Sequence, residues 1–316
     1  MTDRRTFLGQ SLLAGTGIVA GLPLLAHAMP KNPAYYLSLK GGNIGVSLSP
    51  FELLEAAETH GFEAISIEAD QLLDLSEKDR KKFRKKKEKL GLKWGASGLP
   101  LDFRKDKDTF EKGIAALPEK AEILNEFGIT RMGTWIMPTH PSLSYVPNLL
   151  QHTERLRKVA QTLQLYNIRF GLEYVAPKTL MSRSRFPFIR TMQECLQLIH
   201  GINVPNVGLI LDSFHWYCAE DTIDELLQLN PEQIVAVDLN DATAGRTRDE
   251  QVDGQRQLPM ASGIIDLKAF MEALAQIGYD GPLRAEPFNQ ELRDMKPAKA
   301  LETTANSMKT TIALAG

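Results

Sequence analysis

A short apolar stretch, Val207-Gly208-Leu209-Ile210-Leu211-Asp212, follows Asn206 and ends in an acid. The segment Ile168-Arg169-Phe170-Gly171-Leu172-Glu173 has the same form, and so does Ile234-Val235-Ala236-Val237-Asp238. Apolar runs of this length, bounded by residues that favour turns, are typical of buried strands. We therefore predict that each of these segments is a strand with a carboxylate at its end.

The same unit recurs along the chain, because each helical stretch ends at a Gly or an Asn and a strand candidate follows. The helix stops are Gly61, Gly91, Gly128, Asn167, Asn206, Asn230 and Gly278. The predicted strands are 35–39, 63–68, 92–95, 129–136, 168–173, 207–212, 234–238 and 282–286. Gly and Asn suit these stops because the residue after a helix often takes the left-handed conformation.

The segments between the strands are predicted amphipathic helices. Ser49-Pro50-Phe51-Glu52 offers a cap, a proline at the first helical position and a capping-box acid. Strands that alternate with helices imply a parallel sheet, and eight such units predict an α/β fold, a single (β/α)8 TIM barrel. An open doubly wound sheet is the alternative, but no Gly-x-Gly-x-x-Gly motif follows the first strand.

Composition excludes several classes of protein. The 316 residues include 37 Lys and Arg against 39 Asp and Glu, which gives a net charge of −2 and argues against a basic nucleic-acid binder. The two cysteines, Cys195 and Cys218, cannot build a disulfide framework, and we expect two buried thiols. The basic stretch 78–89 is either a patch for polyanions or a solvated outer helix anchored by Phe83 and Leu90. We favour the solvated helix, because no aromatic residues alternate with the charges for base stacking.

The first 28 residues differ from the rest of the chain. Arg4 and Arg5 precede a weakly apolar run from Ser11 to Leu25, and Ala26-His27-Ala28 is a small-x-small cleavage pattern. This arrangement predicts a twin-arginine export signal over 1–28, a barrel domain over 29–316 and a periplasmic location. A permanent transmembrane anchor is the alternative.

Acids occupy the ends of five predicted strands: Glu68, Glu173, Asp212, Asp238 and Glu286. In a barrel of this kind the C-terminal ends of the strands form the active site. Carboxylates gathered there repel one another unless a divalent cation, or a set of Arg and Lys partners, offsets their charge. We favour one divalent cation, Mn²⁺ or Mg²⁺, because all-oxygen ligation suits hard ions.

A histidine lies three residues beyond Asp212, in the sequence Asp212-Ser213-Phe214-His215-Trp216. His215 can reach the same pocket and donate a hydrogen bond to a substrate oxygen. The alternative is that His215 packs on Trp216.

Several motifs together resemble the xylose isomerase-like barrel superfamily, in the branch of sugar phosphate isomerases and epimerases. They are Gly171-Leu172-Glu173, Asp212-x-x-His215, Val237-Asp238-Leu239-Asn240-Asp241, Gly263-Ile264-Ile265-Asp266, Ile277-Gly278-Tyr279-Asp280-Gly281-Pro282 and Glu286-Pro287. The resemblance implies that Glu173, Asp212 and Glu286 bind one divalent metal and that His215 contacts substrate. The usual fourth ligand is a histidine, and this chain has Asp238 there. Asp238 is therefore predicted as a fourth carboxylate ligand, with Asn240 or water as the alternative.

The resemblance also implies carbonyl–enediol chemistry, in which a metal-stabilised enediolate forms and Glu173 and Glu286 transfer the protons. Candidates to hold substrate hydroxyls are Arg246, Arg248 and Arg256, and candidate apolar walls are Trp135, Trp216 and Phe288.

The predicted function is a metal-dependent isomerase or epimerase of an unphosphorylated sugar or keto-sugar, since phosphorylated intermediates are normally kept in the cytoplasm. The alternatives are a lyase, dehydratase or hydrolase of keto-sugars or oxidised glycosides, and a non-catalytic sugar-binding protein. An abasic-site endonuclease shares this fold but needs a histidine-rich zinc site. The expected partner is a small sugar, without nucleic acid and without stable membrane insertion after signal cleavage. A homo-oligomer stays open.

Overall fold

The computed structural model describes residues 34–315, so the predicted export signal over 1–28 lies outside the described residues. The strands are β1 (Tyr36–Leu39), β2 (Ala64–Ile65), β3 (Lys93–Trp94), β4 (Ser97–Gly98), β5 (Arg131–Ile136), β6 (Thr139–His140), β7 (Arg169–Tyr174), β8 (Phe186–Pro187), β9 (Val207–Asp212), β10 (Ile234–Leu239) and β11 (Pro282–Ala285). The α-helices are α1 (Pro50–His60), α2 (Ala69–Leu73), α3 (Glu77–Lys89), α4 (Lys107–Glu126), α5 (Tyr145–Gln164), α6 (Lys178–Met181), α7 (Met192–Ile202), α8 (Ser213–Ala219), α9 (Ile223–Leu226), α10 (Leu267–Gln276), α11 (Gln290–Asp294) and α12 (Pro297–Ile312).

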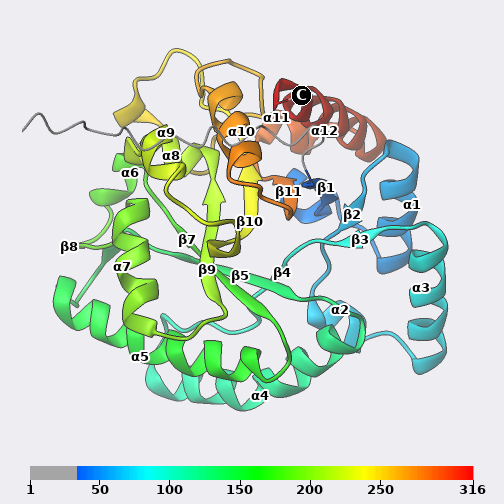
Figure 1. Cartoon of the computed structure of the whole chain (residues 1–316), viewed down its shortest axis with the longest axis horizontal. Coiled ribbons are helices and arrows are strands. Elements are labelled where there is room, and N and C mark those ends of the chain that lie inside the picture. The colour runs from blue at the N-terminus through cyan, green and yellow to red at the C-terminus, as the bar shows by residue number, and fades with distance from the viewer. Residues whose placement is uncertain (1–33, 316) are drawn as a thin grey trace, which may run out of the picture.

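Nine strands form one curled parallel sheet in the order β3-β2-β1-β11-β10-β9-β7-β5-β4. The two end strands, β3 and β4, follow each other in the chain with only Gly95 and Ala96 between them. They are therefore two halves of one barrel strand, which pairs with β2 through its first half and with β5 through its second. The sheet thus closes into eight strands, with the helices around it (Figure 1). The predicted (β/α)8 barrel is confirmed.

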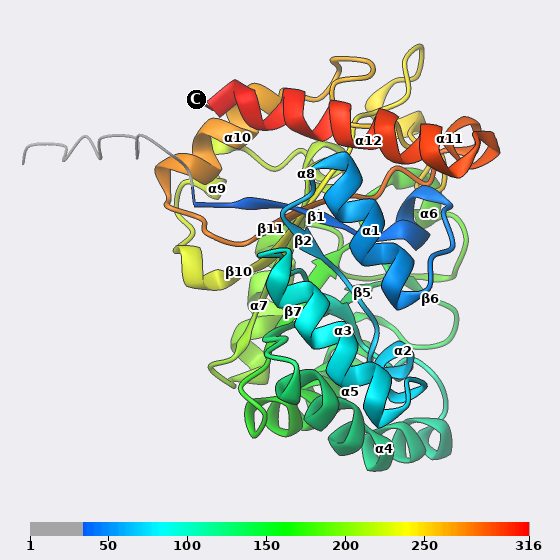
Figure 2. The same ribbon diagram turned by 90° about the vertical axis from the view of Figure 1, so that its right-hand side faces the viewer.

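The last helix completes the outer layer beside the first. Lys309 on α12 donates a hydrogen bond from Nζ to the carbonyl oxygen of His60, at the end of α1 (2.8 Å). Figure 2 shows the two helices next to each other. The beginning and the end of the described chain are therefore joined on the outside of the barrel.

Most of the predicted helix stops hold, and two do not. Gly61, for example, follows α1 with a φ of 74°, and the capping box of Ser49 and Glu52 is present at the other end of that helix. Helix α7 instead ends at Asn203, whose φ is 53°, while the Asn206 side chain donates to two carbonyl oxygens. Asn230 precedes a short 3-10 turn rather than ending a helix, with a φ of −86°.

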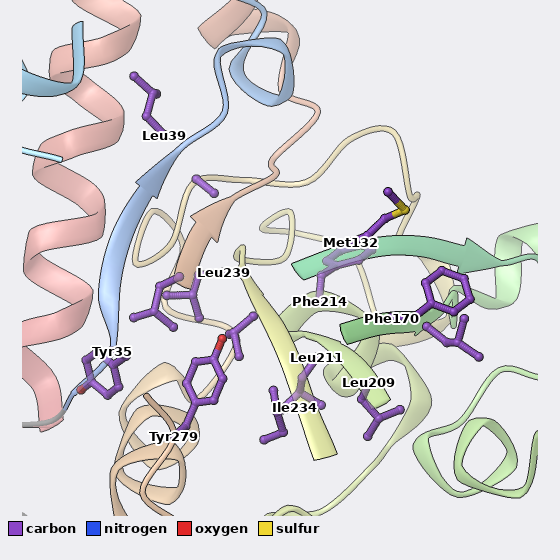
Figure 3. Packing of buried hydrophobic residues seen from close by; sticks show 14 of the residues in the cluster. Tyr35, Leu39, Met132, Phe170, Leu209, Leu211, Phe214, Ile234, Leu239 and Tyr279 are labelled. Atoms are coloured by element: carbon purple, nitrogen blue, oxygen red, sulfur yellow. The ribbon is translucent and has the colours of Figure 1, made fainter. Parts of the chain in front are cut away.

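The main core lies between the sheet and the helices, and Figure 3 shows part of it around Phe170, Leu209 and Leu211. The apolar side chains inside the barrel are few and form a cluster of their own, apart from the main core. Ala96, Ile210 and Ala236 form a separate buried cluster there. Because side chains alternate across a strand, the inward face of β9 carries Ile210 and then Asp212 at its end. The small interior thus leaves the strand-end side chains free to converge.

The basic stretch is the outer helix α3, and Phe83 is its one buried residue. Phe83 packs against Phe51, Trp94 and Phe127, with ring centroids 5.6 to 6.3 Å apart. Leu90, which caps the helix, is partly buried against the same core. The solvated, anchored helix is the arrangement that the structure has.

Both cysteines are buried free thiols, as expected. None of the helices within residues 34–315 has the length and apolar character needed to cross a membrane.

Candidate metal centre and active site

Four strand-end carboxylates converge at the C-terminal end of the barrel. Glu173, Asp212, Asp238 and Glu286 each place one oxygen within 4.8 Å of the others. Asp238 and Asp212 are register partners on β10 and β9, so their adjacency follows directly from strand pairing. The structure therefore brings together all four residues that the sequence predicts as metal ligands.

Asp212 is fully buried, and both oxygens of its carboxylate accept hydrogen bonds from neighbouring groups. Its Oδ1 accepts from the backbone amides of Phe214 (2.6 Å) and His215 (3.2 Å), because it caps the N-terminus of α8. Its Oδ2 accepts from Asn240 Nδ2 (2.8 Å) and Arg256 Nη1 (2.9 Å). Burial raises the pKa of Asp212 to about 7, even though Arg256 opposes the shift.

Glu173 lies in the opposite situation, because its buried Oε1 has no hydrogen-bond partner among residues 34–315. Burial raises its pKa well above the ordinary value, and the neighbouring Glu286 and Asp212 raise it further. The pKa of Glu286 is also raised, by burial first and by Asp238 next. Two carboxyls with raised pKa values thus lie side by side.

Arg256 is the cation at the centre of the cluster, and only 2% of its surface is exposed. Its guanidinium donates to Asp212, to Asp253 Oδ1 (2.7 Å) and, more distantly, to Glu286 Oε2 (3.4 Å). The group lies over the rings of Phe214 and Phe288, 5.2 and 4.8 Å from their centroids. Of the three arginines considered from the sequence, Arg256 is the one that enters the site.

A second buried cation, Arg284, neutralises Asp238. Arg284 Nε and Nη2 donate to the two oxygens of Asp238 at 2.5 and 2.6 Å. The two residues are register partners on β11 and β10. Asp238 therefore has both oxygens engaged by one side chain.

His215 faces the same pocket from α8, with Nε2 3.0 Å from Arg256 Nη2 and 3.7 Å from Glu173 Oε1. Burial lowers the pKa of His215 to about 3, with Arg256 adding to the effect, so the imidazole is neutral. Because a guanidinium has no acceptor, Nε2 accepts the hydrogen bond from Arg256. His215 contacts the cluster and is not packed on Trp216.

The arrangement fits a divalent cation on charge and on chemistry. When all are ionised, the four carboxylates and Asp253, which also pairs with Arg256, carry five negative charges against two guanidiniums, and a divalent ion would offset two of the three that remain. Within residues 34–315 no donor reaches the buried Glu173 Oε1, and an unpaired acceptor of this kind is costly unless something binds it. Carboxylate oxygens are the ligands that Mg²⁺ and Mn²⁺ prefer.

The structure gives Trp216 and Arg246 partners away from the four acids. The Trp216 ring packs against Phe270 of the outer helix α10, with ring centroids 5.4 Å apart. Arg246, in the loop after β10, donates from Nη2 to Gln255 Oε1 (2.6 Å). Neither contact brings Trp216 or Arg246, both predicted to bind substrate, to the acid cluster.

The remaining aromatic candidates lie closer to the site. Trp135 is the register partner of Glu173 and is 48% exposed, held by the guanidinium of Arg104 at 4.3 Å from its ring. Phe288 has a φ of 43°, an uncommon conformation for a non-glycine residue, and packs on Arg256. Arg248 lies on the surface, 3.5 Å from Glu220.

Glu68, the acid of the second strand, stands apart from the four. It accepts from Gly98 N (2.7 Å) and forms an ion pair with Lys40 (2.8 Å). The two line a cavity of about 520 Å³ between the ends of β1 and β2. A lysine therefore offsets the charge of Glu68, and Glu68 does not join the cluster of four acids.

Sequence reasoning missed Arg284, Asp253 and Lys40 as members or neighbours of the site. Arg284 interrupts an otherwise apolar strand two residues before Glu286, and strand alternation places both on one face. A charged residue within an apolar strand, on the face that carries Glu286, is the sequence feature that could have identified Arg284 as part of the site. Asn240 was considered only as a ligand, and it holds Asp212 and accepts from the backbone of Glu286 (2.9 Å).

Comparison with known proteins finds several relatives of moderate similarity. The chain is 27% identical to the inosose isomerase of Bacillus subtilis over 161 residues, which are 50% of this chain and 52% of that protein. It therefore spans about half the length of this relative. It is 25% identical to the L-ribulose 3-epimerase of Mesorhizobium japonicum over 224 residues, which are 69% of each chain.

One solved structure resembles the whole described barrel. It is a xylose isomerase domain protein from Alicyclobacillus acidocaldarius, which is 28% identical with a TM-score of 0.80. The match covers 89% of this chain and 99% of that one. A family profile described as xylose isomerase-like TIM barrel also matches residues 54–311, which is most of the sequence. The chain belongs to the xylose isomerase-like TIM barrel family.

Proposed function

We propose that this protein is a divalent-metal-dependent isomerase or epimerase of an unphosphorylated sugar or keto-sugar. The observation that carries the proposal is the convergence of Glu173, Asp212, Asp238 and Glu286, two of them glutamates with raised pKa values. The relatives named as sugar isomerase and epimerase support the same reaction class.

Glu173, Asp212 and Glu286 would hold the cation, with Asp238 as the candidate fourth ligand. When bound, the ion would polarise a carbonyl oxygen and the hydroxyl oxygen next to it, which makes the neighbouring C–H bond acidic. Manganese or magnesium suits an all-carboxylate set better than zinc does.

The chain's own residues supply the proton transfer. A carboxyl with a raised pKa is suited to exchange a proton near neutral pH, because it is neither a strong acid nor permanently ionised. We assign removal of the proton to one of Glu173 and Glu286 and its return to the other. Return on the opposite face of the same carbon gives an epimer, and return to the neighbouring carbon gives an isomer.

Two further side chains orient the substrate. The Arg256 guanidinium has donors aimed at Asp212 and Glu286, so an oxygen bound between these acids would meet a fixed positive charge. Neutral His215 accepts a hydrogen bond from Arg256 at Nε2, so it acts on the substrate by holding that guanidinium in place without adding charge.

We also propose that the protein is exported to the periplasm by the twin-arginine route. The support is the sequence of residues 1–28, with paired arginines, a weakly apolar run and a small-x-small cleavage pattern. An exported enzyme meets few phosphorylated sugars, and this is why we name an unphosphorylated substrate.

A product assay tests the proposed function. Purified protein loaded with Mn²⁺ is incubated with a panel of unphosphorylated ketoses and inososes, and products are identified by ¹³C NMR. We expect conversion of at least one substrate to its epimer or isomer, lost in Glu286→Gln and kept in the exposed control Glu58→Gln. Release of water instead would identify a dehydratase, which is a lyase. No conversion across the panel would contradict the proposal.

A further inference from the structure

The Asp238–Arg284 ion pair is the most completely satisfied charge pair in the site. The side chain of Asp238 is 0% exposed and that of Arg284 is 8% exposed. Two parallel hydrogen bonds of 2.5 and 2.6 Å join them. A fork of this kind fixes both partners, because each donor meets its own oxygen.

Glu173 and Glu286 have oxygens that are less engaged than those of Asp238. Glu173 Oε1 has no partner within the described part of the chain, and Glu286 Oε2 meets only a long contact from Arg256 at 3.4 Å. Asp212 accepts two hydrogen bonds at each oxygen, so its place among the ligands rests on the proposed function and not on free acceptor capacity. Glu173 and Glu286 each therefore offer an oxygen with less competition than Asp238 does.

Charge points the same way. With Arg284 the Asp238 carboxylate forms a neutral unit, so it adds no net attraction for a cation. Moving Asp238 onto a metal would leave the buried guanidinium of Arg284 without its partner, and an unpaired buried charge is strongly unfavourable.

We propose that the Asp238–Arg284 pair takes the place of the fourth metal ligand, so that three carboxylates, Glu173, Asp212 and Glu286, hold the cation. This inference rests on the proposed function and refines its metal site. Asp238 is then a positioning residue, one that holds Arg284 beside the cluster and is not bound to the ion. The acid at the position where the resemblance implies a histidine is thus compensated within the chain, by an arginine on the next strand.

The test measures Mn²⁺ affinity directly, by calorimetry and by the loss of the free-ion EPR signal, on protein freed of metal. In the double variant Asp238→Asn/Arg284→Met the carboxylate and its counter-charge disappear together. We expect the double variant to bind Mn²⁺ within about threefold of the wild type, because three ligands remain. Asp212→Asn, which removes a ligand, is the positive control and should lose about a hundredfold or more, beyond the usual effect of a residue that only supports a ligand.

The two single variants should change the Mn²⁺ affinity in opposite directions, because each removes one half of a neutral pair. Asp238→Asn leaves Arg284 unpaired and should weaken Mn²⁺ binding about 10-fold to 100-fold. Arg284→Met frees the Asp238 carboxylate and should tighten binding. Circular dichroism checks each fold, and Asp238→Asn/Arg284→Gln, which keeps a polar pair, replaces the first double variant if that one does not fold.

A loss in either folded double variant as large as that in Asp212→Asn would overturn the inference and make Asp238 a ligand, while leaving the proposed function intact. A wild-type protein that binds no Mn²⁺ and no other divalent cation would overturn the three-carboxylate site together with the metal dependence of the proposed function.

Discussion

Glu173 and Glu286 are chemically unlike ordinary surface glutamates. Glu173 is buried and Glu286 is largely buried, both have raised pKa values, and each is surrounded by further carboxyls. A buried acid of this kind costs stability when it ionises, and it persists in folded proteins mainly where function uses it. The same property that destabilises the site makes the two residues suitable for proton exchange.

The first prediction concerns these two residues. Glu173→Gln and Glu286→Gln keep the shape of the side chain but remove proton transfer and weaken a proposed metal ligand, so at saturating Mn²⁺ the rate constant of isomerisation should fall about 100-fold to 10,000-fold. Steady-state kinetics measures the change. Full activity in both variants would show that other groups move the proton, and Glu58→Gln is the matched control because Glu58 is exposed.

The second prediction concerns pH in the metal-free protein. Asp212 titrates at about 7 when folded and near 4 when unfolded, so the folded state holds the extra proton between these values. Stability contributed by such a group is present at low pH and is lost as pH rises through the folded pKa. Buried His215, with a pKa of about 3, contributes the opposite change only below about pH 6.5, so the window above that value belongs to the carboxyls.

The free energy of unfolding should therefore fall between pH 6.5 and 8.5. The slope should reach at most about 1.4 kcal/mol per pH unit for each carboxyl that still holds its proton. Urea unfolding at fixed ionic strength measures it. A saturating divalent cation should flatten the curve, and a metal-free protein that gains stability over the same range would contradict the assigned pKa shifts.

The sequence predicts the acids of the site better than the arginines that pair with them. Glu173, Asp212, Asp238 and Glu286 could be recognised because each follows its own apolar run, which is a local signal. Arg284 and Arg256 pair with acids 46 and 44 residues away, and such pairs depend on strand register and loop path. No local pattern contains that information.

The strands owe their convergence to small residues inside the barrel. A Cβ atom built on Gly171 would lie 2.7 Å from Ile210 Cγ1, and one built on Gly208 would collide with the backbone carbonyl oxygen of Gln233. These glycines therefore let neighbouring segments approach closely. Their place below the acids of β7 and β9 links barrel packing to the geometry of the site.

The third prediction follows from Gly208. Gly208→Ala should destabilise the protein by about 1–3 kcal/mol, because the methyl group meets backbone that cannot rotate away. Gly42→Ala is the control, since no atom of the described residues lies within 4 Å of a Cβ at that position. Thermal and urea unfolding compare the two. Equal stability of both variants would contradict the close approach at Gly208.

The positions of the strands could be predicted from the sequence, and some helix ends could not. All eight strands lie where the apolar runs predict them, since burial against helices selects those residues. Asn206 was wrong as a helix stop because Asn203 already takes the left-handed conformation three residues earlier. Two asparagines so close together give the same local signal, and packing determines which one ends the helix.

The whole molecule separates its charges between an outer surface and an inner site. Helix α3 carries its lysines and arginines outward around the single anchor Phe83, while the acids gather at the end of the barrel. The net charge of −2 conceals this separation. The closed barrel followed from the count of strand–helix units, whereas the interruption of one strand at Gly95 and Ala96 did not.

The fourth prediction concerns export. Replacing the paired arginines, as in Arg4→Lys/Arg5→Lys, should retain the protein in the cytoplasm with its leader uncleaved, because the twin-arginine pathway reads that pair. Cell fractionation and mass spectrometry of the N-terminus measure the outcome. The unmodified chain should begin at Met29 in the periplasm, and a protein found there with residues 1–28 still attached would contradict cleavage.

Deuterium exchange tests the central claim most directly. Mn²⁺-loaded protein is incubated in D₂O with an unphosphorylated ketose, and the C–H bonds on the two carbons beside the carbonyl are followed by ¹H NMR. We predict that hydrogen on one of these two carbons is replaced by deuterium, that EDTA stops the exchange and that Glu286→Gln abolishes it. Absence of exchange with every ketose and inosose tested, in protein shown to hold its metal, would contradict a site built for proton transfer.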